Sequence, residues 1–202
     1  MNASSTRLAA VIAVLTLALA GCVGGPATDS DTVRARFSAD PQSFDPAKLV
    51  GSDDYYASRM LFDTLLRYDD DGDIVGGLAE DWDFDASGGT VELADGATCT
   101  DGTAIDAAVV AESLNRFASP DTQSGSKILV FGNGDVTASA KDSNTVEISL
   151  SEPFSELDAG LTMVASGIVC PAGLEDLDGL FSGSVPDAFS GPFTLASATS
   201  GV

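Results

Sequence analysis

The 202-residue sequence predicts a mixed α/β fold, and three observations lead to this prediction. Short segments in which apolar and polar residues alternate, as they do in half-buried strands, recur along the chain. Between them lie longer segments with a helical spacing of apolar residues and a capping residue in front. Turn-forming Gly, Asp, Asn and Pro separate the segments. A chain of this length is expected to form one domain, or one and a half.

Two helices are expected from their start signals. Ser52 is the expected N-cap of a helix over 53–68, with two aspartates in its first turn, where the helix dipole favours negative charge. The apolar stripe of this helix consists of Tyr56, Met60, Leu61, Leu65 and Tyr68. Asp106 is the expected cap of a second helix over 107–117. A further helix-like segment is expected from Pro153–Phe154 to about Val164.

Alternating patterns predict the strands, which are expected at 32–38, 77–84, 90–94, 135–139, 145–150, 168–171 and 190–195. In the second of them Trp82 and Phe84 alternate with acidic residues, which indicates one buried face. The acidic run 69–73 invites comparison with a calcium loop. Neither frame of the run places both the acidic residues and the glycine where an EF-hand needs them, so a solvated turn is the expected structure.

The charge balance excludes several classes of function. The chain has 31 acidic residues, 9 basic residues and no histidine, for a formal net charge of -22. Binding to nucleic acid or to anionic lipid headgroups needs clustered Lys and Arg, so neither partner is expected. Without histidine, Ser-His and Cys-His hydrolase mechanisms are excluded for this chain acting alone. No phosphate-binding glycine loop and no metal-ligand spacing is present, and no cofactor is expected.

The first residues are typical of an export signal. A polar start with one arginine precedes an apolar run over 8–20, which is too short to cross a bilayer core of about 30 Å but suits a signal peptide. The run ends in Leu19-Ala20-Gly21-Cys22, which looks like a bacterial lipobox. Residues 1–21 are therefore expected to be removed as a lipoprotein signal peptide, and Cys22 to be acylated. The alternative is a plain secretory signal. The small, polar stretch 22–31 is expected to be a flexible tether.

Cysteine usage then predicts one disulfide. The chain has three cysteines, and lipidation of Cys22 leaves Cys99 and Cys170 as a pair in an oxidising compartment. A bridge between these two is the expected arrangement. The alternative is a pair of separate buried thiols.

Four stretches, in this order, resemble the family 5 extracytoplasmic solute-binding proteins of ABC importers for oligopeptides, dipeptides, nickel and related solutes. They are D-P-Q-S-F-D-P-A (40–47), the run 61–82 ending in G-L-A-E-D-W, the segment 94–106 around D-G, and S-G-P-F (190–193). The chain departs from the family pattern at Gly77, where proline is common, at Cys99 in place of an aromatic or apolar residue, and at Asp106 in place of a capping threonine.

This resemblance implies a periplasmic-binding-protein type II fold, present incompletely. It divides the chain into a first-lobe N-terminal segment (32–51), an inserted α+β subdomain (52–188) and a return strand into the first lobe (189–202). Members of the family close two lobes over the ligand, and the second lobe is expected to be missing from these 202 residues. The chain is therefore expected to be an N-terminal fragment.

The resemblance also supplies candidate site residues and partners. The first lobe's share of the solute pocket is expected around Ser38, Asp40, Tyr55 and Tyr56, although aromatic residues at a helix start more often pack in a core. The implied partners are a peptide or other small solute, the ABC permease subunits and, through Cys22, the extracytoplasmic face of the bacterial membrane; the protein is expected to be a monomer. The alternatives are a truncated lipoprotein without transport competence and a secreted glycosidase that works with carboxylates alone.

Overall fold

The computed structural model describes residues 36–199, and the compact unit within it begins at Phe37. The expected signal peptide, the tether, Cys22 and the strand predicted at 32–38 lie wholly or mostly outside the described residues. In the part of that strand that is described, residues 36–38, the chain is not in a sheet. Within the described range no helix is long and apolar enough to cross a membrane.

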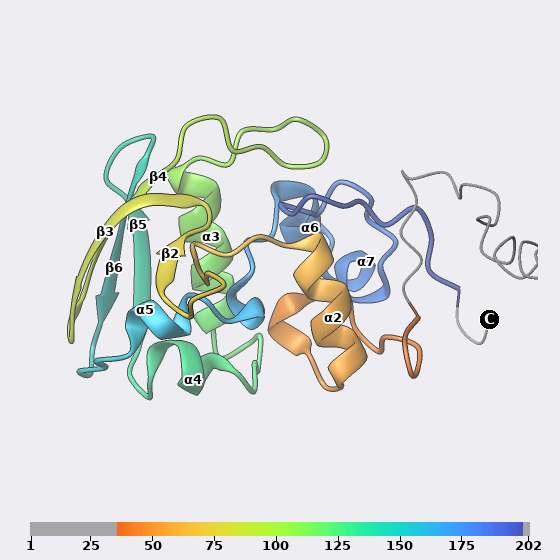
Figure 1. Cartoon of the computed structure of the whole chain (residues 1–202), viewed down its shortest axis with the longest axis horizontal. Helices are drawn as coiled ribbons and strands as arrows, with labels where there is room; N and C mark the ends of the chain where they lie inside the picture. The colour runs from red at the N-terminus through yellow and green to blue at the C-terminus, as the bar shows by residue number, and fades with distance from the viewer. Residues whose placement is uncertain (1–35, 200–202) are drawn as a thin grey trace, which may run out of the picture. The chain divides into compact units, whose positions relative to one another are not determined.

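A four-stranded antiparallel sheet forms one side of this unit (Figure 1). Its strand order is β3-β4-β6-β5, with β3 at Ala79–Asp85, β4 at Gly88–Leu93, β6 at Thr145–Leu150 and β5 at Val136–Ala140. The strands expected from alternation at 77–84, 90–94, 135–139 and 145–150 are thus confirmed within two residues. Trp82 and Phe84 are partly buried against the core while the acidic residues between them are exposed, as the pattern predicts.

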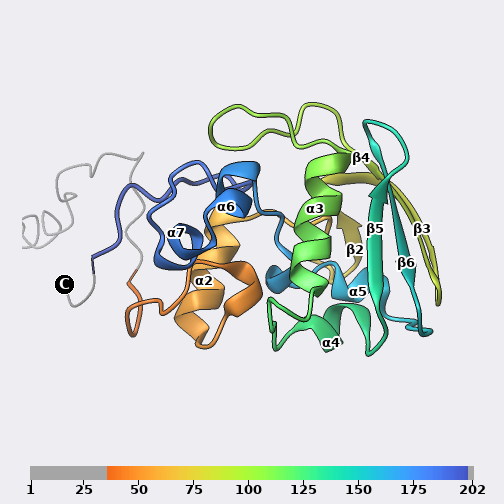
Figure 2. The ribbon, with the colours of Figure 1, turned by 180° about the vertical axis from the view of Figure 1, so that it is seen from behind.

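The helix α3, Ala107–Ala118, packs along the β5 side of the sheet (Figure 2). Its predicted cap is confirmed, since the Asp106 carboxylate accepts hydrogen bonds from the backbone N–H groups of Ala108 and Val109, both at 3.0 Å. Val110, Leu114 and Phe117 are buried on one face of the helix. This face and the sheet form the larger of two hydrophobic cores.

The helix predicted over 53–68 is right only in its first part. The helix α2 covers Ser52–Leu61, and the chain then becomes extended and forms the strand β1, Leu66–Tyr68, which pairs with β2, Ile74–Gly76. The physical reason is non-local. The carbonyl of Leu65 accepts hydrogen bonds from Gly77 and Ala79, so strand pairing replaces the helix that the apolar spacing favours. The predicted turn at 69–73 joins β1 and β2.

A second core contains residues of α2, of α6 at Pro171–Glu175 and of α7 at Leu177–Ser182. Ala47 of the 3₁₀ turn at Pro46–Lys48 packs in the larger core instead. The buried members of the second core include Phe62 and Phe189, whose rings meet edge to face with centroids 5.3 Å apart. The strand predicted at 168–171 is reduced to a single bridge between Val169 and Phe189, and the strand predicted at 190–195 is wrong, since that segment is not in a sheet. The return segment is instead held by single bonds, such as the one from Gly191 N–H to the Leu61 carbonyl at 2.8 Å.

The remaining helices are short. The helix expected from 154 to 164 is wrong in its length, since only Leu157–Gly160 (α5) and a 3₁₀ turn at Val164–Ser166 are helical. Gly160, the last residue of α5, lies directly against the Val130 backbone, where a β-carbon at position 160 would come within 2.3 Å of the Val130 carbonyl oxygen. The helix α4, Lys127–Phe131, precedes β5 and was not predicted.

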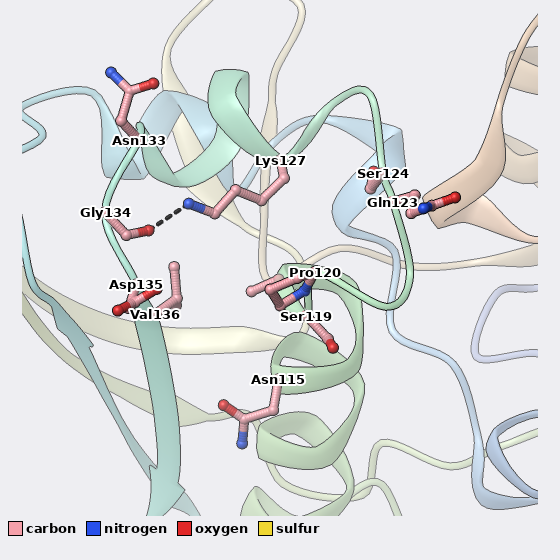
Figure 3. A pocket seen from close by; sticks show the side chains of 11 residues that line it. Asn115, Ser119, Pro120, Gln123, Ser124, Lys127, Asn133, Gly134, Asp135 and Val136 are labelled. Atoms are coloured by element: carbon pink, nitrogen blue, oxygen red, sulfur yellow. Dashed lines mark hydrogen bonds between the residues drawn. The ribbon is translucent and has the colours of Figure 1, made fainter.

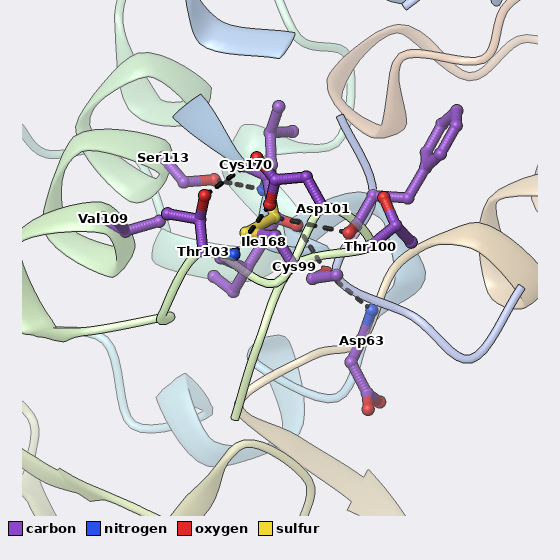
Figure 4. Close-up of a disulfide and its surroundings, with 12 residues drawn as sticks. Asp63, Cys99, Thr100, Asp101, Thr103, Val109, Ser113, Ile168 and Cys170 are labelled. Carbon is purple, nitrogen blue, oxygen red and sulfur yellow. Dashed lines mark hydrogen bonds between the residues drawn. A yellow bond between two sulfur atoms is a disulfide. The ribbon is translucent and has the colours of Figure 1, made fainter. Parts of the chain in front are cut away.

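The predicted disulfide between Cys99 and Cys170 is present (Figure 4). It joins the loop after β4 to the residue before α6, and both cysteines are buried. Two hydrogen bonds accompany it, from Thr100 N–H to the Phe189 carbonyl at 3.0 Å and from Val169 N–H to the Ser113 hydroxyl at 2.9 Å. Both cysteines lie in the larger core, and the bridge ties the loop after β4 to Cys170, which directly follows Val169 of the second core.

Candidate ligand-binding site

Two aspartates in the first turn of α2 hold the loop that contains two of the predicted site residues. The Asp53 carboxylate accepts bonds from the Ser38 hydroxyl at 2.7 Å, from Ser38 N–H at 3.0 Å and from Ala39 N–H at 3.0 Å. The Ser38 hydroxyl, followed by the backbone N–H groups, holds the pKa of Asp53 below its ordinary value. This carboxylate therefore stays ionised and ties the loop to the helix.

Asp54 holds the same loop from its other end. Its carboxylate accepts bonds from Gln42 N–H at 2.7 Å, Val50 N–H at 2.9 Å and Gly51 N–H at 3.2 Å. Burial raises the pKa of Asp54, but the backbone donors together outweigh that effect and hold the pKa below its ordinary value. The loop 38–51 is thus fixed at both ends by buried negative charge at the start of α2.

The four predicted site residues lie on this assembly in different settings. Tyr55 and Tyr56 are 36% and 61% exposed, so the packed-core role that aromatics at a helix start usually have does not apply to them. Ser38 is exposed, but its hydroxyl is engaged with Asp53. Asp40 lines a cavity of about 320 Å³ together with Phe37, Pro41, Phe44, Ser182, Leu195 and residues 197–199. Neither tyrosine is among the described residues that line this cavity. A ligand role for all four residues stays a prediction.

A charged pair beside this site was not predicted from the sequence. The Arg116 guanidinium, at the end of α3, donates to both carboxylate oxygens of Asp45, with the Nη1–Oδ1 distance at 2.8 Å. The Asp45 carboxylate also accepts from Ala47 N–H at 3.0 Å and so begins the 3₁₀ turn. The Asp45-Pro46 dipeptide is a local signal for that turn, but nothing local announces an arginine that lies 71 residues away.

Between residues 36 and 199, no group of three or more Cys, Asp or Glu side chains is placed to hold a metal ion. The carboxylates whose pKa values are shifted, Asp53 and Asp54 among them, are all shifted downward by hydrogen bonds. A general acid at neutral pH needs the opposite shift.

Replacing Asp54 with alanine is expected to lower the free energy of unfolding by about 2 kcal/mol, because three backbone donors lose a charged acceptor. Urea unfolding followed by tryptophan fluorescence measures the change. Asp70→Ala is the matched control, since Asp70 is an exposed residue of the β1–β2 turn, and its effect is expected to stay within about 0.5 kcal/mol. Equal effects of the two variants would contradict the structural role of Asp54.

Acid is expected to destabilise the fold in a defined window. Asp53 and Asp54 have folded-state pKa values below their ordinary ones, so the unfolded chain takes up protons first as the pH falls. Their contribution is complete above the ordinary aspartate pKa of about 3.9 and is lost as the pH falls below it. Urea midpoints between pH 6 and pH 2.5 test this, and a midpoint that rises below pH 4 would contradict it. In Asp54→Ala the decline should be shallower.

Comparison with known proteins identifies the family to which this chain belongs. The model of the bacterial extracellular solute-binding proteins, family 5 (middle region), matches residues 73–202. The chain belongs to this family. The solved structures that resemble it are of periplasmic and substrate-binding proteins, so the predicted type II binding-protein fold is confirmed, and the described residues form part of it.

The named relatives described below are binding proteins. The chain is 31% identical over 179 residues to the probable D,D-dipeptide-binding periplasmic protein DdpA of Escherichia coli K12, across 79% of this chain and 32% of DdpA. It is 41% identical, with a TM-score of 0.72, to a substrate-binding protein of Microbacterium hydrocarbonoxydans in complex with 4-hydroxybenzoate hydrazide, across 81% of this chain and 34% of that one. The murein tripeptide-binding protein MppA of E. coli gives a TM-score of 0.68 at 26% identity. The chain thus spans about a third of the length of these relatives.

Proposed function

We propose that the chain supplies the first-lobe part of a solute-binding lipoprotein of an ABC importer, which captures peptides or a related small solute on the extracytoplasmic face of the bacterial membrane. Family membership carries this proposal. DdpA and MppA, by their names, bind short peptides, whereas the Microbacterium protein holds an aromatic hydrazide. The class of solute is therefore proposed only as short peptides or small molecules of that kind.

The exposed start of α2 is the proposed first-lobe contact surface. Tyr55 and Tyr56 offer rings and hydroxyls to a ligand, and Asp53 and Asp54 hold the neighbouring loop 38–42 in a fixed conformation. A preorganised loop lowers the entropy cost of binding. The second lobe is proposed to come from polypeptide outside these 202 residues, because the chain covers only 32% of the length of DdpA.

Calorimetric titration with a library of di- to pentapeptides tests the proposal. The 202-residue chain alone is expected to show no saturable binding, and a longer polypeptide that continues in the same reading frame is expected to bind. In that longer protein Tyr56→Ala should weaken binding about tenfold, whereas Tyr68→Ala, an exposed tyrosine on β1, should leave it unchanged. Tight binding by the 202-residue chain would overturn the two-lobe proposal. No binding by the longer protein would overturn peptide capture.

The lipid anchor has its own test. When the chain is expressed in a bacterium supplied with labelled palmitate, label is expected in the membrane fraction. Cys22→Ala should remove the label and release the exported chain. Label that persists in this variant would contradict acylation at Cys22.

A further inference from the structure

The edge of the sheet formed by β5 is only partly covered by other groups. β5 is an edge strand, and its residues alternate between pairing with β6 and pointing away from it. The backbone N–H and C=O of Ala138 point away from β6, and the Asn115 side chain of α3 binds both of them. Ala138 N–H donates to Asn115 Oδ1 at 2.8 Å, and Asn115 Nδ2 donates to the Ala138 carbonyl at 2.7 Å. This edge therefore already binds one amide group that is not part of the sheet.

Val136 presents the same pair of groups two residues earlier. The alternation turns its N–H and C=O outward, because Ser151 N–H bonds the carbonyl of the preceding residue, Asp135, on the β6 side. Within residues 36–199 no other group takes up the outward N–H and C=O of Val136. A strand edge with unpaired backbone groups is a template for an added extended segment.

Lys127 lies at one end of the gap in edge coverage, which is the stretch of β5 around the unpaired N–H and C=O of Val136. Its ammonium donates to the carbonyls of Gly132, at 3.0 Å, and Gly134, and it forms no ion pair with a carboxylate of the described residues (Figure 3). Three sets of outward backbone groups therefore follow one another along the edge. The Gly134 carbonyl is bound by Lys127, the N–H and C=O of Val136 are unpaired, and the N–H and C=O of Ala138 are bound by Asn115. A half-buried positive charge with only neutral partners is suited to a carboxylate.

The gap opens into a cavity of about 460 Å³. The cavity is lined by Asn115, Lys127, Gly134 and Val136 together with Ala118, Ser119, Pro120, Gln123, Ser124, Asn133 and Asp135. We propose that this cavity binds the carboxyl-terminal residue of a peptide, or another N-acyl amino acid, as a short addition to the edge of β5. The ligand carboxylate accepts from Val136 N–H and Lys127, and the ligand amide N–H donates to the Val136 carbonyl.

Chain direction agrees with this orientation. The N–H of Val136 lies on the Lys127 side and its carbonyl lies on the Asn115 side, so the bound residue runs antiparallel to β5 with its acyl group toward Asn115 and Ser119. The site is separate from the α2 surface proposed for solute capture, and its test does not depend on that proposal.

The test uses N-acetyl-L-alanine as the probe and ¹⁵N-labelled chain, exported as its Cys22→Ser variant. Titration is expected to shift the backbone signals of Val136 and its neighbours saturably, with a dissociation constant on the order of 1 mM. N-acetyl-L-alanine amide, which lacks the negative charge, should bind about tenfold more weakly. Saturable shifts elsewhere, no shifts, or equal affinity for the two probes would overturn the proposal.

Variants at Lys127 and Val136, with a control at Lys141, separate binding from folding. Lys127→Gln should weaken the acid probe to the level of the amide, and Lys127→Arg should restore it, whereas Lys141→Gln on the β5–β6 turn should change nothing. Val136→Pro removes only the outward N–H, which an edge strand tolerates, and should abolish binding while the signals of β6 stay dispersed. Full binding by a folded Val136→Pro variant would contradict the backbone contact.

Discussion

Replacing Arg116 with methionine is expected to destabilise the chain by about 4 kcal/mol. The substitution leaves the Asp45 carboxylate, whose side chain is only 1% exposed, without its cationic partner. The Arg116 side chain is 12% exposed, so little water can replace the guanidinium. The loss of one member of a buried pair costs more than the pair contributes, because the remaining charge stays desolvated.

Urea unfolding of the full chain measures this effect. Lys141→Met is the matched control, since Lys141 and Glu147 form an exposed pair at 3.6 Å, and its expected cost is below about 1 kcal/mol. The double variant Asp45→Asn/Arg116→Met should recover more than half of the loss, because a neutral amide still accepts from Ala47 N–H without a buried charge. A cost for Arg116→Met as small as that of the control would contradict this account.

Local signals in the sequence were sufficient for much of the fold. The helix α3 was predictable because Asp106 and the apolar face that follows it are neighbours in the chain. β6 was predictable because alternation over 145–150 reflects a strand with one buried face. The end of α2 was not, because Leu65 has both a helical neighbourhood and a distant strand partner at Gly77, and the partner determines the conformation.

The location of the candidate site at the start of α2 comes from the family resemblance and stays a prediction. The resemblance pointed to the start of α2, but the exposure of Tyr55 and Tyr56 follows from which face of the helix the second core covers. In the sequence, Asp53 and Asp54 were interpreted as negative charges that the dipole of the helix favours. In the structure their main role is to accept hydrogen bonds from a loop as many as 15 residues away. The bond between Asp45 and Arg116 depends on tertiary structure alone.

Removal of the disulfide is the second large effect that the structure predicts. In the chain-entropy account a bridge between residues 71 positions apart stabilises the fold by about 4 kcal/mol, because it restricts the unfolded chain. Cys99→Ala/Cys170→Ala is therefore expected to lower the melting temperature by about 12 °C. The loss falls on the link between the loop after β4 and the segment around Cys170, so hydrogen exchange at Thr100 and Val169 should rise more than at β6.

Burial of the two sulfurs adds a kinetic consequence. Cys99 is 3% exposed and Cys170 is fully buried, so a thiolate reductant cannot reach the bridge in the folded chain. Dithiothreitol is expected to reduce it only as fast as the chain unfolds, and free-thiol titration with and without urea compares the two rates. Cys22→Ser, which leaves the bridge in place, should match the parent in both melting and reduction. Rapid reduction without urea would show that the Cys99 loop opens without global unfolding. It would contradict the expectation that the folded chain protects the bridge.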